Sequence, residues 1–498
     1  MIDLLASICA LLPIIAVILC ILVFKKTSVF SSCFGLLLAI FISILFHRYR
    51  IDFSQFIEAS KSAFILSLSA IFVILPGLYL NGVIREQKYI DRITHWVEIL
   101  PIPPANKSLI LLTGFLPAVE SLTGFGVSLF LSVPIFLKLF PSDIALKISL
   151  LGMNIMPWGT LALATVIGSS LIQETPAKLG TLTSLTSFII FPYLALASLY
   201  VLGGKNTLYR HALTAIFLGV SLSTFLFLNN YFFAAETAGV ISGIVTGLIG
   251  IYISYPNKSQ IKDLFTLIFL KTFLPYFLVL LIIATTNLIQ PIHLFISNIL
   301  VLKSQNVHFS LFASPGITLI LVSLIMQAMK PVKVSIPAIL FKSRNACLSI
   351  TTFLLLSQVM LQSGMIKNLA TSISQYAGVQ LFTVLSPLIG MMSGFVTGSN
   401  TGGNALLIAV QQKLGDEWGQ GLLFSAAHNS GAGHAVFSSI PIIVLVLTIF
   451  KDEAFSDHLA VEESSLLTFT LKASIGIYFS ILLSLSILLH FNVVSILF

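Results

Sequence analysis

The sequence predicts an all-α polytopic integral membrane protein with about 12 to 14 transmembrane helices. Three observations lead to this fold class: 57% of the 498 residues are apolar, only 9% are charged, and the mean hydropathy is +1.03. Soluble domains carry about 25% charged residues, which cover their surface in water. We therefore expect residues 1–498 to form a single transmembrane domain.

Apolar segments of spanning length follow one another along the chain. The first segment is expected to be a transmembrane helix that is not cleaved, because it starts Met1-Ile2-Asp3 without the basic region of a cleavable signal peptide. Lys25 and Lys26 follow it, so the N-terminus is expected outside the cell membrane. The expected segments are 4–24, 28–46, 62–84, 107–140, 144–171, 181–203, 211–229, 234–254, 264–290, 309–329, 345–366, 379–410, 421–450 and 466–490.

Charge and cysteine content exclude several partners. The 26 Lys and Arg, which give a net charge of +8, are scattered between apolar runs and fit loop anchoring at a lipid bilayer, so no nucleic acid is expected. The four cysteines lie in apolar segments without CxxC spacing, which predicts neither disulfides nor a metal site. We expect no cofactor.

Two long segments carry sequences that interrupt a helix. Gly114 to Gly126 holds a Pro, a Glu and three Gly in thirteen residues, and Ser393 to Leu406 holds four Gly, two Thr, two Asn and two Ser in fourteen. Such density disfavours a continuous helix. Irregular backbone at membrane depth is tolerated only inside protein or beside a watery cavity. Paired interruptions of this kind indicate the binding site of a secondary transporter.

The two interruptions also suggest an internal repeat. A shift of about 280 residues sets Gly114 against Gly394 and Glu120 against Asn400, and a slightly smaller one sets Asn154 against Asn429. We expect repeats over about 55–203 and 333–450, with connecting helices over about 204–330 and a final helix at about 466–490. Basic clusters follow the segment 62–84 but precede 345–366, which predicts inverted repeats.

Glu120 and Asn400 are the candidates for ion coupling. A carboxylate at membrane depth is costly and usually marks an ion or proton pathway, although Glu120 could instead cap the broken helix beside it. The segment around Asn400 could coordinate a small cation with carbonyl groups, and the half-helix after it could meet an anion with its N–H groups. Close helix packing through small residues is the alternative for this segment.

The remaining candidates would contact substrate. His428 and His434 are six residues apart, which places them on different helix faces and argues against a joint metal site. No GxSxG, HExxH or Walker sequence is present, so we expect no enzyme and no ATP-driven pump. The predicted substrate-binding residues are Ser121, Thr123, Gly124, Gly126, Asn154, Ser399, Thr401, Gly402, Asn404, His428, Asn429 and Ser430.

At these residues the sequence resembles the L-lactate permease family, carriers of lactate and glycolate. Ala118 to Val127 keeps the Glu and the Gly-Phe-Gly of a family segment that reads approximately FLEGAAGFGTPVAI. Phe395 to Leu406 reads FVTGSNTGGNAL, where the family reads approximately FITGSDTSSNALF. The chain departs from the family at Asn400, which replaces an Asp, and at Gly402 and Gly403, which replace two Ser. Further departures are Val127 and Ser128 for Thr-Pro, and Phe437 where a Lys is expected.

The resemblance implies a secondary transporter that takes up a small 2-hydroxy monocarboxylate by proton symport, with Glu120 carrying the proton. Because of the departures, coupling to Na⁺ and transport of a different organic anion are alternatives. Separately, the sequence is compatible with a homo-oligomer. An integral membrane enzyme that acts on lipid headgroups is the alternative from another class. That enzyme would require an acidic or histidine cluster on an interfacial loop, and the sequence offers none.

Overall fold

The computed structural model describes residues 2–124, 126–256, 267–304, 307–453 and 461–498. Within these residues, nine helices are long and apolar enough to cross a membrane, and there are up to eleven spans if each of two bent helix pairs is one span. The predicted all-α polytopic membrane fold is confirmed. Strand structure in the described residues is limited to one antiparallel hairpin, β1 (Val301–Ser304) and β2 (Val307–Ser310).

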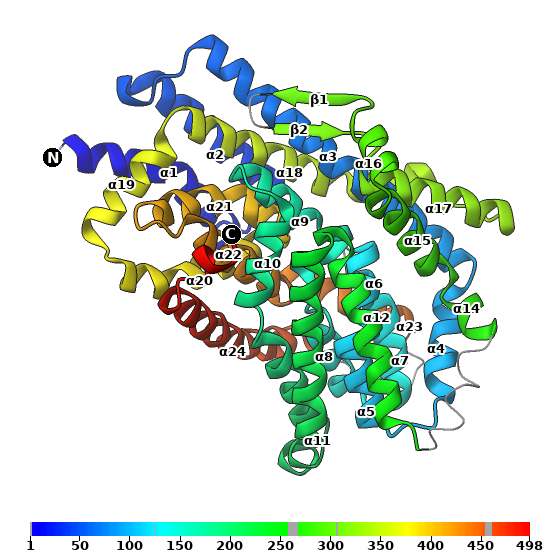
Figure 1. Cartoon of the computed structure of the whole chain (residues 1–498). Coiled ribbons are helices and arrows are strands. Elements are labelled where there is room, and N and C mark those ends of the chain that lie inside the picture. Colours follow the sequence, from blue (N-terminus) through cyan, green and yellow to red (C-terminus); the bar gives the residue numbers. More distant parts are fainter. Residues whose placement is uncertain (1, 125, 257–266, 305–306, 454–460) are drawn as a thin grey trace.

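Along the chain we group the elements into a first series, a connecting region and a second series (Figure 1). The first series is α1 (Ile2–Leu22), α2 (Ser28–Leu45), η1 (His47–Tyr49), α3 (Phe53–Glu86), α4 (Tyr89–Ile99), α5 (Pro104–Ile110), η2 (Leu111–Phe115), α6 (Leu116–Thr123), α7 (Val127–Leu139), α8 (Ser142–Gly152), η3 (Met156–Trp158), α9 (Gly159–Leu171), α10 (Pro176–Thr186) and α11 (Ile190–Phe232). The connecting elements are α12 (Ala235–Ser254), α14 (Leu267–Thr272), α15 (Leu274–Leu288), α16 (Gln290–Ser297), the hairpin and α17 (Pro315–Met329). The second series is α18 (Ile336–Gln362), α19 (Met365–Tyr376), α20 (Val379–Thr397), α21 (Asn400–Asp416), α22 (Gly421–Ala435), η5 (Val436–Ser438), α23 (Ile440–Glu453), α24 (Glu463–His490) and α25 (Val493–Leu497).

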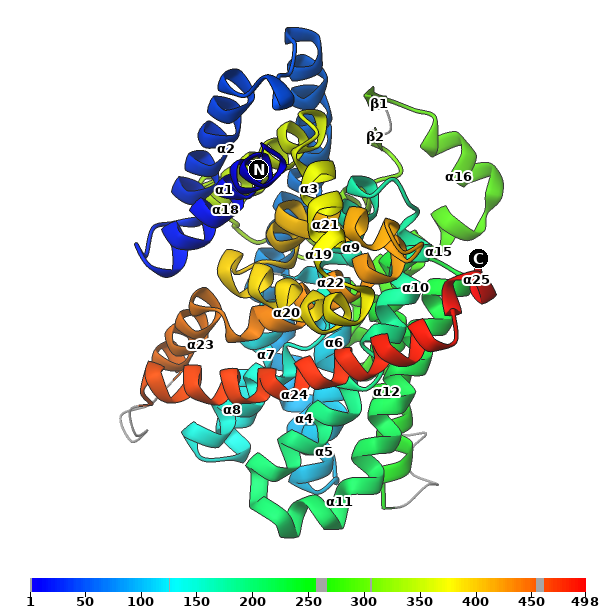
Figure 2. The ribbon, with the colours of Figure 1, turned by 90° about the vertical axis from the view of Figure 1, so that its left-hand side faces the viewer.

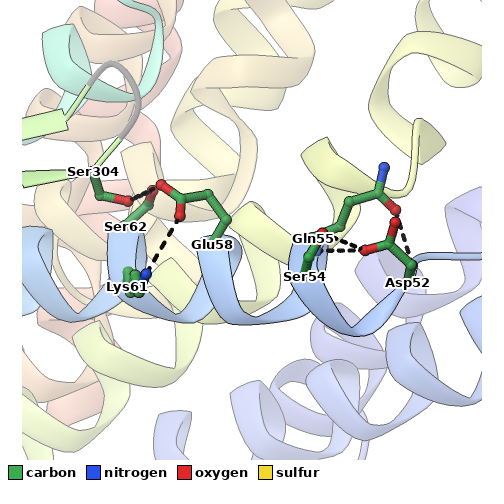
Figure 3. A network of polar contacts seen from close by, with 7 residues as sticks. All are labelled: Asp52, Ser54, Gln55, Glu58, Lys61, Ser62 and Ser304. Carbon is green, nitrogen blue, oxygen red and sulfur yellow. Dashed lines mark hydrogen bonds and ion pairs between the residues drawn. The ribbon is translucent and has the colours of Figure 1, made fainter.

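Helix α3 starts at a capping box. The Asp52 carboxylate accepts a hydrogen bond from the Gln55 backbone N–H at 2.7 Å, and the Gln55 side chain accepts one from the Asp52 N–H at 2.9 Å. The bond from the Gln55 N–H is the main reason why the pKa of Asp52 lies below its usual value. One turn later, Glu58 accepts a hydrogen bond from the Ser304 hydroxyl at 2.5 Å (Figure 3). The Glu58–Ser304 hydrogen bond ties β1 to α3.

Helices α3 and α18 lie side by side and run in opposite directions (Figures 1 and 2). Near the end of α3, Gly82 lies against Val334, which directly precedes α18. At the opposite end, Asn368, just beyond α18, accepts a hydrogen bond from Arg48 at 2.8 Å and donates one to the Tyr49 hydroxyl at 2.7 Å. The start of α3 therefore meets the end of α18.

Both predicted helix interruptions are present. The first separates α6 from α7 at Gly124 and Gly126, whose φ angles are +67° and +75°. The second separates α20 from α21 at Gly398, whose φ angle is +65°. Glycine is suited to these positions because residues with a Cβ rarely adopt positive φ.

Two further interruptions were not predicted from the sequence, which indicated single helices over 144–171 and 421–450. Helices α8 and α9 meet at a bend of 54°, where Pro157 cannot donate a backbone hydrogen bond. Helices α22 and α23 are separated by η5 and the extended residue Ser439. Pro441, the second residue of α23, has no backbone N–H to donate to the Phe437 carbonyl, so a continuous helix from α22 into α23 would lose that hydrogen bond.

The positions of the two breaks pair residues of the first and second series in a different register from the one that the sequence suggested. The N–H of Gly124 donates to the carbonyl of Glu120 at 2.7 Å, and the N–H of Gly398 donates to the carbonyl of Gly394 at 2.9 Å. Each glycine therefore ends its helix in the same way, and Gly394, rather than Asn400, stands opposite Glu120. The sequence match had relied on Gly114, which lies in the π-helical turn η2, far from the break.

Candidate functional site

A cavity of about 820 Å³ adjoins the second break. One side of it is formed by the start of α21, with Ser399, Asn400, Thr401 and Gly402. The other sides come from the turn between α1 and α2, the middle of α18, the start of α9, the end of α20 and the start of α23. Segments far apart in the sequence therefore meet around one hollow.

The charges around the cavity are of one sign. Lys25 and Lys26 belong to its lining, and no Asp or Glu is among the described lining residues. Lining of this kind attracts anions and raises their local concentration. The remaining lining is mainly apolar, including Met153 and Met156, with the hydroxyl-bearing Thr160 near the break.

The start of α21 presents unused hydrogen-bond donors. Ser399 caps the helix by accepting a hydrogen bond from the Gly402 N–H at 3.4 Å. The backbone N–H groups of Asn400 and Thr401 donate to no described residue, as expected for the first turn of a helix. The oxygen Oδ1 of Asn400, a residue only 2% exposed, also has no partner among the described residues.

Asn429 connects four helices through its side-chain amide. Its Oδ1 accepts hydrogen bonds from Asn400 Nδ2 at 3.1 Å and Asn404 Nδ2 at 2.8 Å. Its Nδ2 donates to Thr165 Oγ1 at 2.9 Å and Thr183 Oγ1 at 3.0 Å. Asn429 on α22 is thus tied to α9, α10 and α21, and all its hydrogen-bonding capacity is used.

His428, Ser430 and His434, which lie near Asn429 on α22, contact backbone and hydroxyl groups of neighbouring segments. His428 Nε2 lies 3.2 Å from the Gly403 carbonyl oxygen. Ser430 and His434 both contact the Ser187 hydroxyl, at 2.5 Å and 3.0 Å. These three side chains are buried and do not belong to the lining of the cavity.

Glu120 lies in the first break and reaches the start of α7. Its Oε1 accepts a hydrogen bond from the Gly126 N–H at 2.9 Å. Its Oε2 accepts one from the Ser128 N–H at 3.0 Å and another from the Ser128 hydroxyl at 2.7 Å. The carboxyl group is fully buried, and no salt bridge to it is found among the described residues.

Thr160 joins the two breaks. It packs against Gly124 in the first break and also lines the cavity beside the second. Its φ angle of +52° belongs to a left-handed turn that continues through Ala162. The first break is therefore one residue removed from the cavity wall.

The structure divides the predicted substrate-binding residues. Ser399, Thr401 and Gly402 line the cavity together with Asn400, whereas Gly124 and Gly126 form the first break with Glu120. The others make internal contacts: Ser121 packs on Gly239, Thr123 donates to the Val119 carbonyl at 2.7 Å, Asn154 donates to the Leu112 carbonyl at 3.2 Å, and Asn404 donates to the Ala164 carbonyl at 2.8 Å. Phe125 of the Gly-Phe-Gly sequence lies outside the described residues.

Sequence reasoning did not find several cavity residues. Lys25 and Lys26 read as a basic flank of the first span, and nothing local indicates that their loop reaches the second break. Thr160 lies just after Pro157 and the two methionines lie just before it, and that proline is the signal that could have indicated a third interruption.

We expect Gly124→Ala to destabilise the protein by about 2 kcal/mol or more, because φ +67° and ψ −167° are essentially restricted to glycine. A Cβ there would also collide with Thr160. The comparison is Gly364→Ala, where φ is +74° but no atom lies within 4 Å of the new Cβ. Thermal unfolding midpoints of the purified variants in detergent test this expectation. Equal midpoints would contradict it.

The sequence is similar to known proteins of one family. The sequence matches the model of the L-lactate permease family over residues 6–262 and 247–494, which together span nearly the whole chain. A protein named L-lactate permease from Streptococcus iniae is 24% identical over 442 residues, which cover 82% of this chain and 90% of that protein.

Proposed function

The chain belongs to the L-lactate permease family, and from this premise we propose that it carries a small 2-hydroxy monocarboxylate, such as L-lactate or glycolate, by proton symport. Membership of a transporter family removes the alternative of an enzyme acting on lipid headgroups. The substrate and the coupling ion are the parts that need support from the site.

The observation that carries the substrate class is the cavity at the start of α21. Its described lining holds two lysines, no acidic residue and a helix start with free N–H groups. The N-terminus of a helix favours an anion because its N–H groups and the helix dipole both point toward it. A single carboxylate matches this single helix start.

We propose that Glu120 binds the coupled proton. Burial disfavours its charge, whereas three hydrogen bonds favour it, so neither form is strongly excluded. Two of the three donors are backbone N–H groups, which cannot accept a hydrogen bond. The Ser128 hydroxyl can reverse its direction, and we therefore place the proton on Oε2, facing Ser128.

Coupling to Na⁺ is the second candidate. The unpartnered Oδ1 atoms of Asn400 and Asn404 support it, because amide oxygens suit a hard cation. In this case Asn400 would coordinate Na⁺, and the transported anion could differ from lactate.

The setting is proposed to be the cell membrane, with the N-terminus outside and the series containing α3 and α18 as inverted repeats. The opposite directions of these two helices support the repeats. Under this orientation the cavity wall with Lys25 and Lys26 faces the cytoplasm. A homo-oligomer is compatible with the exposed apolar helices.

Uptake of radiolabelled L-lactate and glycolate into proteoliposomes tests the proposed function. With an inward proton gradient and no Na⁺, we expect accumulation that collapses when a protonophore is added. Accumulation that instead requires a Na⁺ gradient would replace the proton by Na⁺. No uptake of either anion under either gradient would overturn the substrate class.

A further inference from the structure

The start of α7 shows how this protein holds a carboxylate. Gly126 is the N-cap residue of α7, and Ser128 is the second residue of the helix. Glu120 accepts hydrogen bonds from the backbone N–H groups of both residues, at 2.9 and 3.0 Å, and from the Ser128 hydroxyl at 2.7 Å. The donor set is thus two backbone N–H groups and one hydroxyl.

The start of α21 has the same donors. Ser399 is its N-cap residue, and Thr401 is the second residue of the helix, again with a hydroxyl. The backbone N–H groups of both donate to no described residue, and the Thr401 hydroxyl has no described hydrogen-bond partner either.

What α21 lacks is the carboxylate. The residue that stands opposite Glu120 is Gly394, as the matching hydrogen bonds of Gly124 and Gly398 show. No described side chain therefore occupies the donors of α21 in the way that Glu120 occupies those of α7.

Two further observations indicate that a ligand completes this site. The residues that carry these donors, Ser399 and Thr401, line the cavity together with Asn400. Asn400 is 2% exposed, and its Oδ1 is buried without a described hydrogen-bond partner. Buried polar atoms are rarely left without a hydrogen bond.

We infer that the carboxylate of the transported anion binds the N–H groups of Ser399 and Thr401 and the Thr401 hydroxyl, and that its 2-hydroxyl donates to Asn400 Oδ1. Glu120 at α7 is thus an internal counterpart of the substrate carboxylate at α21. This assignment rests on the proposed function. It adds that different protein groups bind the carboxylate and the 2-hydroxyl of the substrate.

Because separate groups bind the carboxylate and the 2-hydroxyl, the site should distinguish between monocarboxylates. The carboxylate contacts serve any small monocarboxylate, whereas the Asn400 contact serves only one with a 2-hydroxyl group. Propionate, which is lactate without that hydroxyl, would leave Asn400 Oδ1 buried and unpaired. A site with an unpaired polar group discriminates strongly against such an analogue.

The carboxylate contact is tested by substitutions of Thr401 in the full-length protein in proteoliposomes. Thr401→Val keeps the shape and removes the hydroxyl, so we expect its KM for L-lactate and for propionate to rise together, by about tenfold. Thr401→Ser, which keeps a hydroxyl, should retain the larger part of the affinity. Thr383→Val is the matched control, because Thr383 lies on α20 and donates to the Val379 carbonyl, outside the cavity.

The hydroxyl contact is tested by comparing the two anions. We expect the wild type to prefer L-lactate over propionate by about tenfold, and Asn400→Ala to lose that preference. The inference is overturned if Thr401→Val resembles Thr383→Val, or if the wild type does not prefer L-lactate. Both of these results can be read even if Asn400→Ala does not fold. If the wild type takes up neither anion, the proposed function itself fails.

Discussion

Glu120→Gln is expected to abolish the accumulation of substrate against a gradient while the protein still inserts and folds. Gln has nearly the same shape, and its side-chain oxygen can accept the hydrogen bond from the Gly126 N–H. Its amide group would face the Ser128 N–H, so one hydrogen bond is lost, at a cost of about 1–3 kcal/mol. Because Gln cannot bind or release a proton, a proton gradient can no longer drive uptake.

Exchange of labelled for unlabelled L-lactate distinguishes this loss from a general failure. Exchange needs no net movement of protons, so Glu120→Gln should retain it and lose only the response to the gradient. Glu236→Gln is the control, because Glu236 is a partly buried acid in the first turn of α12 and does not line the cavity. Normal accumulation by Glu120→Gln would remove Glu120 from the coupling mechanism.

The membrane fold and the two central interruptions could be predicted because they depend on local composition. Four glycines in fourteen residues disfavour a helix wherever they lie, and the chain breaks at Gly398, one of the four. The 421–450 interruption was missed because its cause, Pro441, sits inside an otherwise apolar run. Apolar composition alone cannot locate such a break.

The arrangement of the site could not be predicted, because it depends on long-range contacts. Lys25 reaches the cavity through packing of the α1–α2 turn near a break more than 370 positions later. The register between the two series was also misjudged, because glycine-rich membrane sequence aligns with itself at several shifts. Only the hydrogen bonds at Gly124 and Gly398 decide which residue stands opposite Glu120.

Asn429→Leu is expected to lower stability by about 2–3 kcal/mol and to remove transport. Leu has the same number and branching of side-chain heavy atoms as Asn, so the change keeps the outline of the side chain, with bulkier methyl groups, and removes four buried hydrogen bonds. Individual side-chain hydrogen bonds in membrane proteins contribute about 0.6 kcal/mol on average, and a buried donor left unpaired adds to the loss. Asn400 Nδ2 would lose its one described partner, whereas Asn404 Nδ2 would keep the Ala164 carbonyl.

The unfolding midpoint in detergent measures this loss, and Asn298→Leu provides the control, because Asn298 is exposed and donates only to the Leu294 carbonyl of its own helix. Equal midpoints for the two variants would contradict a structural role for the Asn429 network. The transport activity of Asn429→Leu should fall by more than its loss of stability alone would cause. Asn429 fixes Asn400 and Asn404 on the first turns of α21, and the same turns present the donors proposed for the substrate carboxylate. The buried amide on α22 therefore determines where the start of α21 stands in the cavity.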